Sequence, residues 1–599
     1  MFRKSVALSV MSLMMIFGLA SATLQAGTSA TPATAAPSTA TSAVKAAPAT
    51  AAELKGRLLE LASRGQLTDG VITLFKQYAE AHAHEKFAQE VPAKFWTWLD
   101  TDKASRDALL VALHPYYDIG VVRKLMALQE KFPDQINDYR SLALAFAVVY
   151  GRLGDQPLTR NYLTRSRPKT ALPAPSMEES FEYYVKNERA MYFPMKRTPW
   201  PLLAFVADND LPLADRQWAL NRCGKLDYAK FDKVYYEPPY DGTAISDRVG
   251  KLAGQDYTLE NIRNDGGICG DRAYYASRIF KSLGVPSLFE IGKGDRGGHA
   301  WVSWMNPKGG EVDLAFSGRF DFDKYYTGIV WDPTIRQPCL DRDVQLMLIA
   351  VQQSYNGYQE ALIGSYVYRL CAGAARKPAV GLLKDAVRNH NAYCAEPWRD
   401  LAAATAEQLM PRAEGEQMFD DMFGKLAKYP DLTFEALSDV LKPRLEGSAD
   451  TDPETISKNL HLLDAAFGLY EKAKRPDLAT VLRVMQGQYL EKVGRGEDAL
   501  KLYVTNSEKY ADQHYGVVEL FDSAMKLLAV PAKDELRMKY LDLMAHKVPQ
   551  YTSDFNRKYN LPNSIYTHVV EAYVAALKTA GKTAEAEQWA GKLDVKSKN

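Results

Sequence analysis

Cysteine is scarce in this chain. The 599 residues contain five, Cys223, Cys269, Cys339, Cys371 and Cys394, and no two of them stand in CxxC spacing. Zinc ribbons and thioredoxin-like motifs use that spacing, so the sequence suggests neither. Metal-ligand clusters, phosphate-cradling loops and dinucleotide fingerprints are also lacking, and we therefore expect no cofactor and no metal. An odd number of cysteines leaves at least one unpaired, and that thiol needs an explanation.

Net charge is also low. Lysine and arginine number 74 against 73 aspartates and glutamates, which gives a formal charge of +1, and no long basic run occurs. The composition therefore argues against nucleic acid or an anionic membrane surface as a partner. A chain of 599 residues with 47% hydrophobic content predicts about two to four folded units.

An uncharged apolar run lies close to the start of the chain. It extends from Val6 to Leu19, follows the basic start Met1–Lys4, and precedes Ala20-Ser21-Ala22, which fits the small-x-small cleavage pattern. The run is short for a bilayer span. Residues 1–22 are therefore predicted to be a secretory signal peptide. We expect an exported protein, periplasmic or extracellular, with no membrane span once the signal is removed.

The next segment has almost no large apolar residue. From Gly27 to Ala52 the chain is nearly all Ala, Thr, Pro and Ser. Such a composition buries too little apolar surface to offset its ordering entropy. We therefore predict a disordered linker over residues 23–52.

Helical periodicity dominates both flanks of the chain. Apolar residues recur three and four apart from Glu53 to about Leu163, which predicts an α-helical domain of antiparallel hairpins over residues 53–175. Residues 341–599 are also predicted to be helical. In that region GQYLEKVGRGEDALKLY resembles a tetratricopeptide-like hairpin, with Gly487, Gly494 and Ala499 at its small positions and Tyr503 at its aromatic position. Such repeats offer a surface for a protein partner, and an irregular helical bundle is the alternative.

The residues that could take part in catalysis lie in the middle of the chain. Cys269 stands in DGGIC ahead of GDRAYYASRIFKSLG, whose spacing predicts a helix that begins near Cys269 and stops at Gly284. Backbone N–H groups in a first turn lack intrahelical partners, and the helix dipole favours an anion there. The same groups could hold an oxyanion. Cys269 is thus a candidate nucleophile, and a small core residue is the alternative.

Two extended segments follow and carry a histidine and an aspartate. His299 lies in GGHAWVSW, which alternates like a strand, and Asp313 lies in EVDLAF after the turn NPKGG. A hairpin through that turn would set Asp313 on the strand next to His299, where its carboxylate could accept from the far imidazole nitrogen. Cys269, His299 and Asp313 would then supply a nucleophile, a base and an orienting group.

Taken together, these pieces resemble the transglutaminase-like cysteine-hydrolase superfamily. The resemblance rests on Gly267-Ile-Cys269-x-Asp271-x-Ala273 opening a helix, on the LGVPS exit, and on GHAWV around His299 followed by an aspartate on a strand. It covers residues 257–326 of a domain that we assign to 176–340. It implies a papain-like α+β core within a mostly α-helical chain, with Cys269 as nucleophile, His299 as base and acid, and Asp313 as orienter.

The third member of the triad stays open among neighbouring aspartates. The family pattern has a tryptophan shortly before this residue, and here Val312 precedes Asp313. Asp321, Asp323 and Asp332 therefore compete for the role, with Asp313 preferred.

The predicted function is an exported thiol enzyme that acts on an amide or peptide acyl group. His299 would draw the proton of Cys269, and the thiolate would attack the carbonyl. The oxyanion would rest on the backbone N–H of Cys269 and on a second donor, for which Asn261 and Asn264 are candidates by position. The acyl group would pass to water or to an amine, with hydrolysis favoured by the resemblance alone. The expected substrate is a protein or peptide, and cell-wall peptide falls within that class.

A second class of function remains open. The transglutaminase-like fold and the helical repeats could serve as a non-catalytic scaffold that binds proteins. The presence of a Cys, a His and an Asp in the required order favours the enzyme.

Overall fold

The computed structural model describes residues 49–153, 173–246, 249–294, 297–308, 311–319, 324–447, 451–513, 516–552, 557 and 562–593. The predicted signal peptide and most of the predicted linker lie outside these residues. Helices dominate the structure, and one five-stranded sheet gives it the α+β class that the sequence predicts. Across the described ranges, no helix has both the length and the apolar composition needed to cross a membrane.

The chain forms two compact units, and each is described by itself. Unit 1 extends to Ser287 and includes Trp331–Pro338, whereas unit 2 contains Leu288–Val330 and Cys339–Asn599. These units divide the chain differently from the predicted domains, because the helical residues 53–175 share unit 1 with the first part of the predicted domain 176–340. Cys269 consequently belongs to unit 1, and His299 and Asp313 belong to unit 2.

Unit 1 is helical. Its α-helices are α2 (Ala51–Ala62), α3 (Asp69–Phe87), α4 (Ala93–Leu99), α5 (Lys103–Leu113), α6 (Ile119–Lys131), α7 (Arg140–Gly151), α8 (Met177–Lys186), α9 (Trp200–Ala207), α10 (Leu213–Cys223), α11 (Phe231–Val234), α12 (Thr243–Ser246), α13 (Leu259–Asp265) and α14 (Cys269–Ser282). Helix α2 packs on α3, and α6 packs on α7. A side chain at Gly120 or Gly151 would collide with the backbone of the other helix, so these glycines let α6 and α7 touch.

The first described helix begins slightly earlier than predicted. Thr50 caps α2, since its hydroxyl accepts from the Glu53 N–H at 3.2 Å and the Glu53 carboxylate accepts from the Thr50 N–H at 2.8 Å. This capping box satisfies two N–H groups at the helix start. The last residues of the predicted linker are therefore helical.

The core of unit 1 is built around α14. This helix contacts α10 and α13, and every side chain from Ala273 to Ser282 is buried. Its buried charges are satisfied within unit 1: Arg278 pairs with Asp210 at 2.6 Å, and Lys281 donates to the Phe205 carbonyl at 2.7 Å. Burial lowers the pKa of Lys281 to about 8. The helix that begins at Cys269 is thus held tightly along the rest of its length.

The sheet has the strand order β3-β2-β1-β4-β5. Its strands are β1 (Ser287–Gly294), β2 (Gly297–Lys308), β3 (Glu311–Ser317), β4 (Ile329–Asp332) and β5 (Gln337–Leu340). Strands β2 and β3 form the hairpin that the sequence predicts, in a register that pairs Val302 with Ser317 and Asn306 with Asp313. Helix α15 of unit 2 packs against β3.

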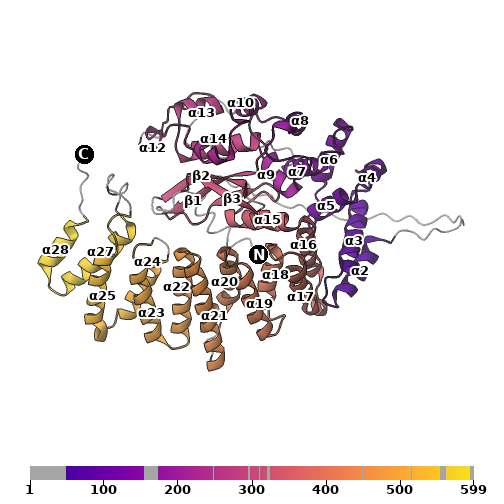
Figure 1. The fold of residues 1–599 in the computed structure, drawn as a ribbon. Coiled ribbons are helices and arrows are strands. Elements are labelled where there is room, and N and C mark those ends of the chain that lie inside the picture. The colour runs from indigo at the N-terminus through magenta and orange to yellow at the C-terminus, as the bar shows by residue number, and fades with distance from the viewer. Residues whose placement is uncertain are drawn as a thin grey trace. The chain divides into compact units, whose positions relative to one another are not determined.

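The helices of unit 2 contact one another in chain order, and their colour in Figure 1 runs from pink at α15 to yellow at α28. They are α15 (Asp341–Gln353), α16 (Tyr355–Leu370), α17 (Arg376–Asp385), α18 (Ala395–Ala406), α19 (Arg412–Lys425), α20 (Pro430–Glu446), α21 (Pro453–Lys472), α22 (Pro476–Lys492), α23 (Gly496–Lys509), α24 (Val517–Leu528), α25 (Asp534–Lys547), α27 (Ser564–Thr579) and α28 (Thr583–Gly591). Gly487 of α22 faces the Tyr503 ring of α23 so closely that a side chain there would overlap the ring. The small and aromatic positions noted in the sequence therefore meet inside one helix hairpin.

Candidate functional site

Cys269 is the first residue of α14, as the sequence predicts. The helix ends at Ser282, and Gly284, the predicted stop two residues later, has a left-handed φ of 73°. Cys269 is half-buried, and its thiol stands at the end of the helix where the N–H groups lack intrahelical carbonyls. This end carries the positive pole of the helix dipole, so it favours a thiolate.

The turn before Cys269 is fixed by Asp271. The Asp271 carboxylate accepts from the Ile268 N–H at 2.9 Å and from the Tyr257 hydroxyl at 2.6 Å. A side chain at Gly267 would overlap this carboxylate, which explains why glycine stands there. Asp271, which the sequence showed only as part of a motif, thus sets the geometry of the turn that presents the thiol.

A second segment of unit 1, residues 235–241, runs beside the same turn. The Gly267 N–H donates to the Pro239 carbonyl at 3.1 Å, and the Gly267 carbonyl accepts from the Asp241 N–H at 3.0 Å. Gly266, with φ of 82°, packs against Pro239 in a space that no side chain could share. Arg272 donates to the Pro238 carbonyl at 2.8 Å, which adds a further bond from α14 to this segment.

This segment brings a tyrosine to the cysteine. Tyr235 is 1% exposed, and burial together with the charge of a Cys269 thiolate holds its pKa well above the usual range. The Tyr235 hydroxyl therefore stays protonated and can donate a hydrogen bond in the neighbourhood of the sulfur. The guanidinium of Arg272 lies 5.9 Å from the Tyr235 ring and 5.4 Å from the Tyr240 ring. Next to it, Tyr236 and Tyr240 are exposed on the protein surface.

The other cysteines differ from Cys269 in their surroundings. Burial raises the pKa of Cys223 to about 11, and it also raises the pKa of Cys371 and Cys394. Cys339 is half-buried like Cys269 but lies on strand β5 instead of at a helix start. Cys339 is therefore the natural comparison for the reactivity of Cys269.

His299 lies on β2, as predicted, and one of its ring nitrogens is bonded to the main chain. The Nε2 atom is 2.7 Å from the Gly318 carbonyl oxygen. A carbonyl can only accept, so Nε2 carries the proton and the lone pair of the neutral ring is on Nδ1. The ring is half-buried and contacts Tyr325 and Trp301, at centroid distances of 5.1 and 6.0 Å. The imidazole is thus oriented with Nδ1 as its basic atom.

A buried carboxyl lies behind this ring cluster. Glu290 is fully buried and accepts from the Trp301 indole at 2.6 Å. Burial, reinforced by the nearby Asp341, raises the pKa of Glu290 to about 8. Glu290 is therefore largely protonated at neutral pH, and it fixes Trp301 beside His299 without adding a full charge.

Asp313 does not orient His299. It lies on the strand next to β2, but the register pairs it with Asn306, seven residues beyond His299. At about 3.3 Å per residue this separation is roughly 23 Å along the strand. The Asp313 carboxylate is exposed and accepts from its neighbour Leu314 at 2.8 Å and from Gln345. The acceptor on the imidazole is the Gly318 carbonyl, in place of the predicted carboxylate.

Of the three competing aspartates, only Asp332 lies within the described residues. Asp321 and Asp323 lie outside the described residues. Asp332 belongs to unit 1, and its carboxylate accepts from the Thr334 N–H at 2.8 Å and from the Thr334 hydroxyl at 2.6 Å. Burial raises the pKa of Asp332. Its carboxylate therefore closes a local turn.

The two predicted oxyanion donors also have other partners. The Asn261 amide donates to the Asp256 carbonyl at 2.9 Å, and Asn264 is exposed and accepts from Arg263 at 3.4 Å. Tyr235, a buried tyrosine whose pKa responds to Cys269, is a candidate donor that the sequence did not indicate. No local pattern marks it, because its place beside the cysteine depends on the pairing of residues 239–241 with Gly267.

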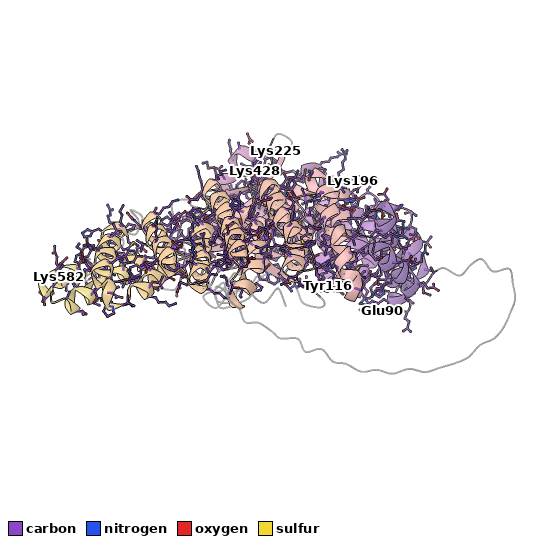
Figure 2. The ribbon with its side chains drawn as sticks, turned by 90° about the horizontal axis from the view of Figure 1, so that it is seen from below. Glu90, Tyr116, Lys196, Lys225, Lys428 and Lys582 are labelled. Carbon is purple, nitrogen blue, oxygen red and sulfur yellow. The ribbon has the colours of Figure 1, made fainter. Side chains whose placement is uncertain are left out.

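Other features of the described residues suggest no further chemistry. No group of three or more His, Cys, Asp or Glu within those residues could hold a metal ion. A shallow pocket of about 390 Å³ lies on unit 1 between the end of α3 and the start of α6, where Glu90 and Tyr116 reach the surface (Figure 2). Lys86 crosses it to donate to the Tyr116 carbonyl at 3.3 Å. The pocket holds no cluster of catalytic side chains.

Comparison of the chain with models of known protein families, with curated proteins and with solved structures gives no match.

Proposed function

We propose that this chain is an exported, transglutaminase-like thiol enzyme that cleaves an amide or peptide acyl group, with Cys269 as nucleophile and His299 as base and acid. The observation that carries the proposal is the 2.7 Å bond from His299 Nε2 to the Gly318 carbonyl. This bond leaves the lone pair on Nδ1, the form that a general base requires. The helix-start position of Cys269 supports the complementary role of the thiol.

The proposed reaction is the hydrolysis of an amide through a thioester. His299 Nδ1 takes the thiol proton of Cys269, and the sulfur forms a bond to the acyl carbon. The oxyanion is stabilised by the Cys269 N–H and the Tyr235 hydroxyl. The C–N bond then breaks as the imidazolium gives its proton to the leaving amine. Water, deprotonated by the same imidazole, attacks the thioester and releases the carboxylic acid and the thiol. Transfer to an amine would follow the same path with an amine in place of water.

The substrate class remains a protein or peptide, with cell-wall peptide included. The exposed rings of Tyr236 and Tyr240, beside the turn that carries Cys269, offer apolar faces and hydroxyl groups to such a chain. The helical repeats of unit 2 offer a separate surface for a protein partner. The proposal includes no cofactor.

A non-catalytic protein-binding scaffold is the second candidate. The exposed position of Asp313, away from His299, favours it, because a full Cys-His-Asp triad is not assembled on these residues. The scaffold needs neither a reactive thiol nor a basic imidazole. The reactivity of Cys269 therefore separates the two candidates.

Alkylation of the full chain tests the proposal. Iodoacetamide is added at pH 6, where an ordinary thiol is almost fully protonated, and the labelled cysteines are mapped by mass spectrometry. We expect Cys269 to be labelled many times faster than Cys339, its half-buried counterpart on a strand. Equal and slow labelling of the two thiols would contradict the enzyme and favour the scaffold.

A bifunctional reagent tests whether the thiol and the imidazole act as a pair. 1,3-Dibromoacetone alkylates a thiolate and then a neighbouring imidazole, with loss of both bromides. We expect a crosslinked peptide that joins Cys269 to His299, and its loss in His299→Gln. If Cys269 reacts once and the second bromide is always lost to water, His299 is not its base.

A further inference from the structure

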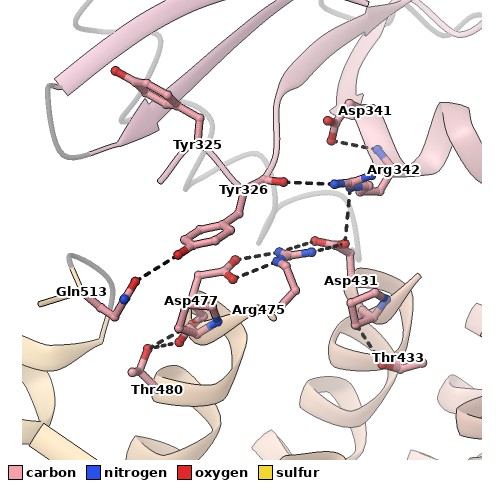
Figure 3. Close-up of polar contacts among 12 residues, drawn as sticks. Tyr325, Tyr326, Asp341, Arg342, Asp431, Thr433, Arg475, Asp477, Thr480 and Gln513 are labelled. Carbon is pink, nitrogen blue, oxygen red and sulfur yellow. Dashed lines mark hydrogen bonds and ion pairs between the residues drawn. The ribbon is translucent and has the colours of Figure 1, made fainter. Parts of the chain in front are cut away.

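A short segment of unit 2, residues 324–328, lies between the sheet and the helical repeats (Figure 3). Its two tyrosines point in opposite directions. Tyr325 is 3% exposed and packs on the His299 ring at 5.1 Å and on the Trp301 ring at 5.4 Å. Tyr326 points to the helices, where its hydroxyl donates to Gln513 at 3.0 Å. One side of the segment therefore contacts the proposed base, and the other side contacts the repeats.

The main chain of this segment is also bound on several sides. Arg319 donates to the Tyr325 carbonyl at 2.7 Å and also to the Tyr326 carbonyl. Arg319 in turn pairs with Asp341, which is fully buried at the start of α15. The Asp341 N–H donates to the Gly328 carbonyl at 2.9 Å. Because these bonds hold three carbonyls of a five-residue segment, the segment has little freedom to shift along or across the sheet.

The repeats meet the segment at two helix starts that share a sequence. Helix α20 begins in Tyr429-Pro-Asp431-Leu and α22 in Arg475-Pro-Asp477-Leu. Arg475 is buried and donates hydrogen bonds to both aspartates, at 2.6 and 2.7 Å to Asp431 and at 2.6 and 2.8 Å to Asp477. Forked bonds of an arginine to carboxylates fix direction as well as distance. The two helix starts therefore form one rigid cluster.

This cluster extends to Tyr326. Arg342 lies 4.0 Å from Asp431 and donates to the Tyr326 carbonyl at 3.4 Å (Figure 3). The Arg475 guanidinium stands 5.9 Å from the Tyr326 ring. The side chain of Lys324, two residues earlier, bonds to the Asp512 carbonyl in the loop after α23. The position of Tyr326 is thus set by three separate parts of the repeats.

We infer that this cluster, with Arg475 and Tyr326 at its centre, positions His299 through Tyr325. Tyr325 and Tyr326 are joined by one peptide unit, so a shift of Tyr326 moves the ring that packs on the imidazole. Arg319, which binds the carbonyls of both tyrosines, directly follows Gly318, the acceptor of the His299 Nε2 proton. The contacts of Arg319 therefore hold both the Tyr325 ring, which packs on the imidazole, and the Gly318 carbonyl, which fixes its tautomer.

This inference deepens the proposed function, because it assigns a positioning role for the proposed base to residues far along the chain. None of them touches the reacting atoms, so they are positioning residues. A partner that binds the repeats near the starts of α20 and α22 would change the orientation of His299. The physical link itself does not depend on the enzyme being active.

The test is nitrogen-15 NMR of the full chain labelled in histidine, with the His299 signals assigned by their loss in His299→Gln. In the unaltered chain we expect Nε2 to be the protonated nitrogen. Tyr326→Ala removes the hydroxyl bond to Gln513 and the ring beside Arg475, so the repeats no longer hold the segment through this side chain. We therefore expect the Nδ1 and Nε2 shifts to move toward the average of a mobile imidazole. Arg475→Lys keeps the charge without the fork and should give a smaller change of the same kind.

Tyr573→Ala is the matched control. Tyr573 also lies in the repeats, on α27, and its hydroxyl bonds to Asp542 at 2.8 Å and to Glu585 at 3.0 Å. We expect this variant to leave the His299 signals unchanged. Should Tyr326→Ala fail to fold, Gln513→Ala removes only the acceptor of the Tyr326 hydroxyl and serves in its place.

Unaltered His299 signals in folded Tyr326→Ala, or in Gln513→Ala if it replaces that variant, together with unaltered signals in Arg475→Lys, would overturn the inference. A shift of the same size in Tyr573→Ala would overturn it too, because the effect would then not be specific to the cluster. The alkylation of Cys269 is measured separately. Its failure would count against the proposed function and would leave this inference standing, since the NMR signals require no turnover.

Discussion

His299 and Gly318 are joined by a hydrogen bond of 2.7 Å between the ring Nε2 and the main-chain carbonyl. A carbonyl carries a partial charge where a carboxylate carries a full one, so it orients the ring with a weaker pull on the proton. The orientation of the imidazole therefore depends on the backbone at Gly318, whose φ of 80° lies in the left-handed region.

Gly318→Ala should lower the rate of the proposed reaction. The left-handed φ costs an alanine roughly 1 kcal/mol, and relief of this strain would displace the carbonyl. A displacement of that kind should lower kcat/KM by between about tenfold and a hundredfold. Steady-state kinetics on an amide substrate gives the measurement. Asp313→Ala is the contrasting variant, and it should change kcat/KM by less than about twofold, since the carboxylate is exposed and bonded elsewhere.

Tyr235→Phe should remove a donor to the oxyanion while leaving the thiol reactive. Loss of one such donor typically costs about 10² to 10³ in kcat. Alkylation of Cys269 forms no oxyanion, so its rate should change little. Tyr116→Phe, on an exposed tyrosine of unit 1 outside residues 235–241, is the control and should keep kcat near the normal value. Equal kcat values for the two variants would exclude Tyr235 as the donor.

Glu290→Gln should change how stability depends on pH. The pKa of this carboxyl is about 8 in the folded chain against 4.5 as reference, so the folded state holds an extra proton between these values. Its stabilising contribution is complete below pH 4.5 and is lost as the pH rises through 8. The unfolding free energy, measured in urea, should fall less between pH 5 and pH 9 in Glu290→Gln than in the unaltered chain. The difference is of the order of a few kcal/mol, at roughly 1.4 per pKa unit.

Glu290→Gln should not abolish the pH dependence completely. Asp341 is also buried with a raised pKa, and it remains in Glu290→Gln, so part of the pH dependence should persist. A variant with the same pH dependence as the unaltered chain would show that Glu290 does not bind the extra proton.

Gly487→Ala should destabilise unit 2. The added methyl group would overlap the Tyr503 ring, and overpacking of this kind costs about 1 to 3 kcal/mol. Gly468→Ala, in the C-terminal part of α21, meets nothing within 4 Å and should instead stabilise the chain by about 0.5 to 1 kcal/mol. Urea unfolding of the two variants should give changes of opposite sign. A gain in stability for Gly487→Ala would show that α22 and α23 can move apart.

Local signals in the sequence predicted the elements around the site. The helix start at Cys269, the stop at Gly284 and the strand that carries His299 all depend on neighbouring residues, such as a glycine past a helix end or alternation along a strand. The hairpin from β2 to β3 was predictable for the same reason. These features require no knowledge of what packs against them.

Such local signals could not predict the register of that hairpin. Residues paired across β2 and β3 have numbers that sum to 619, since 306 + 313 and 302 + 317 both do. Asp313 therefore pairs with Asn306 and not with His299. Placing Asp313 on the neighbouring strand was therefore correct, and placing it beside His299 was not, because strand alternation gives the face of a residue but not its depth along the strand.

Tyr235 and the Gly318 carbonyl could not be read from the sequence for a different reason. Tyr235 reaches the cysteine through pairing of residues 239–241 with Gly267, which is a tertiary contact. The Gly318 carbonyl is a main-chain group, and every residue has one. A search for a third catalytic side chain favours an aspartate and passes over a backbone acceptor.

The bridge from Arg475 to Asp431 and Asp477 also limits how this protein can vary in length. Repeat arrays commonly gain or lose whole hairpins, because each repeat contacts only its neighbours. An extra hairpin inserted between α20 and α23 would separate the two aspartates or carry Gln513 away from Tyr326. Related chains should therefore keep the spacing of this part constant and differ in the number of hairpins that follow α24.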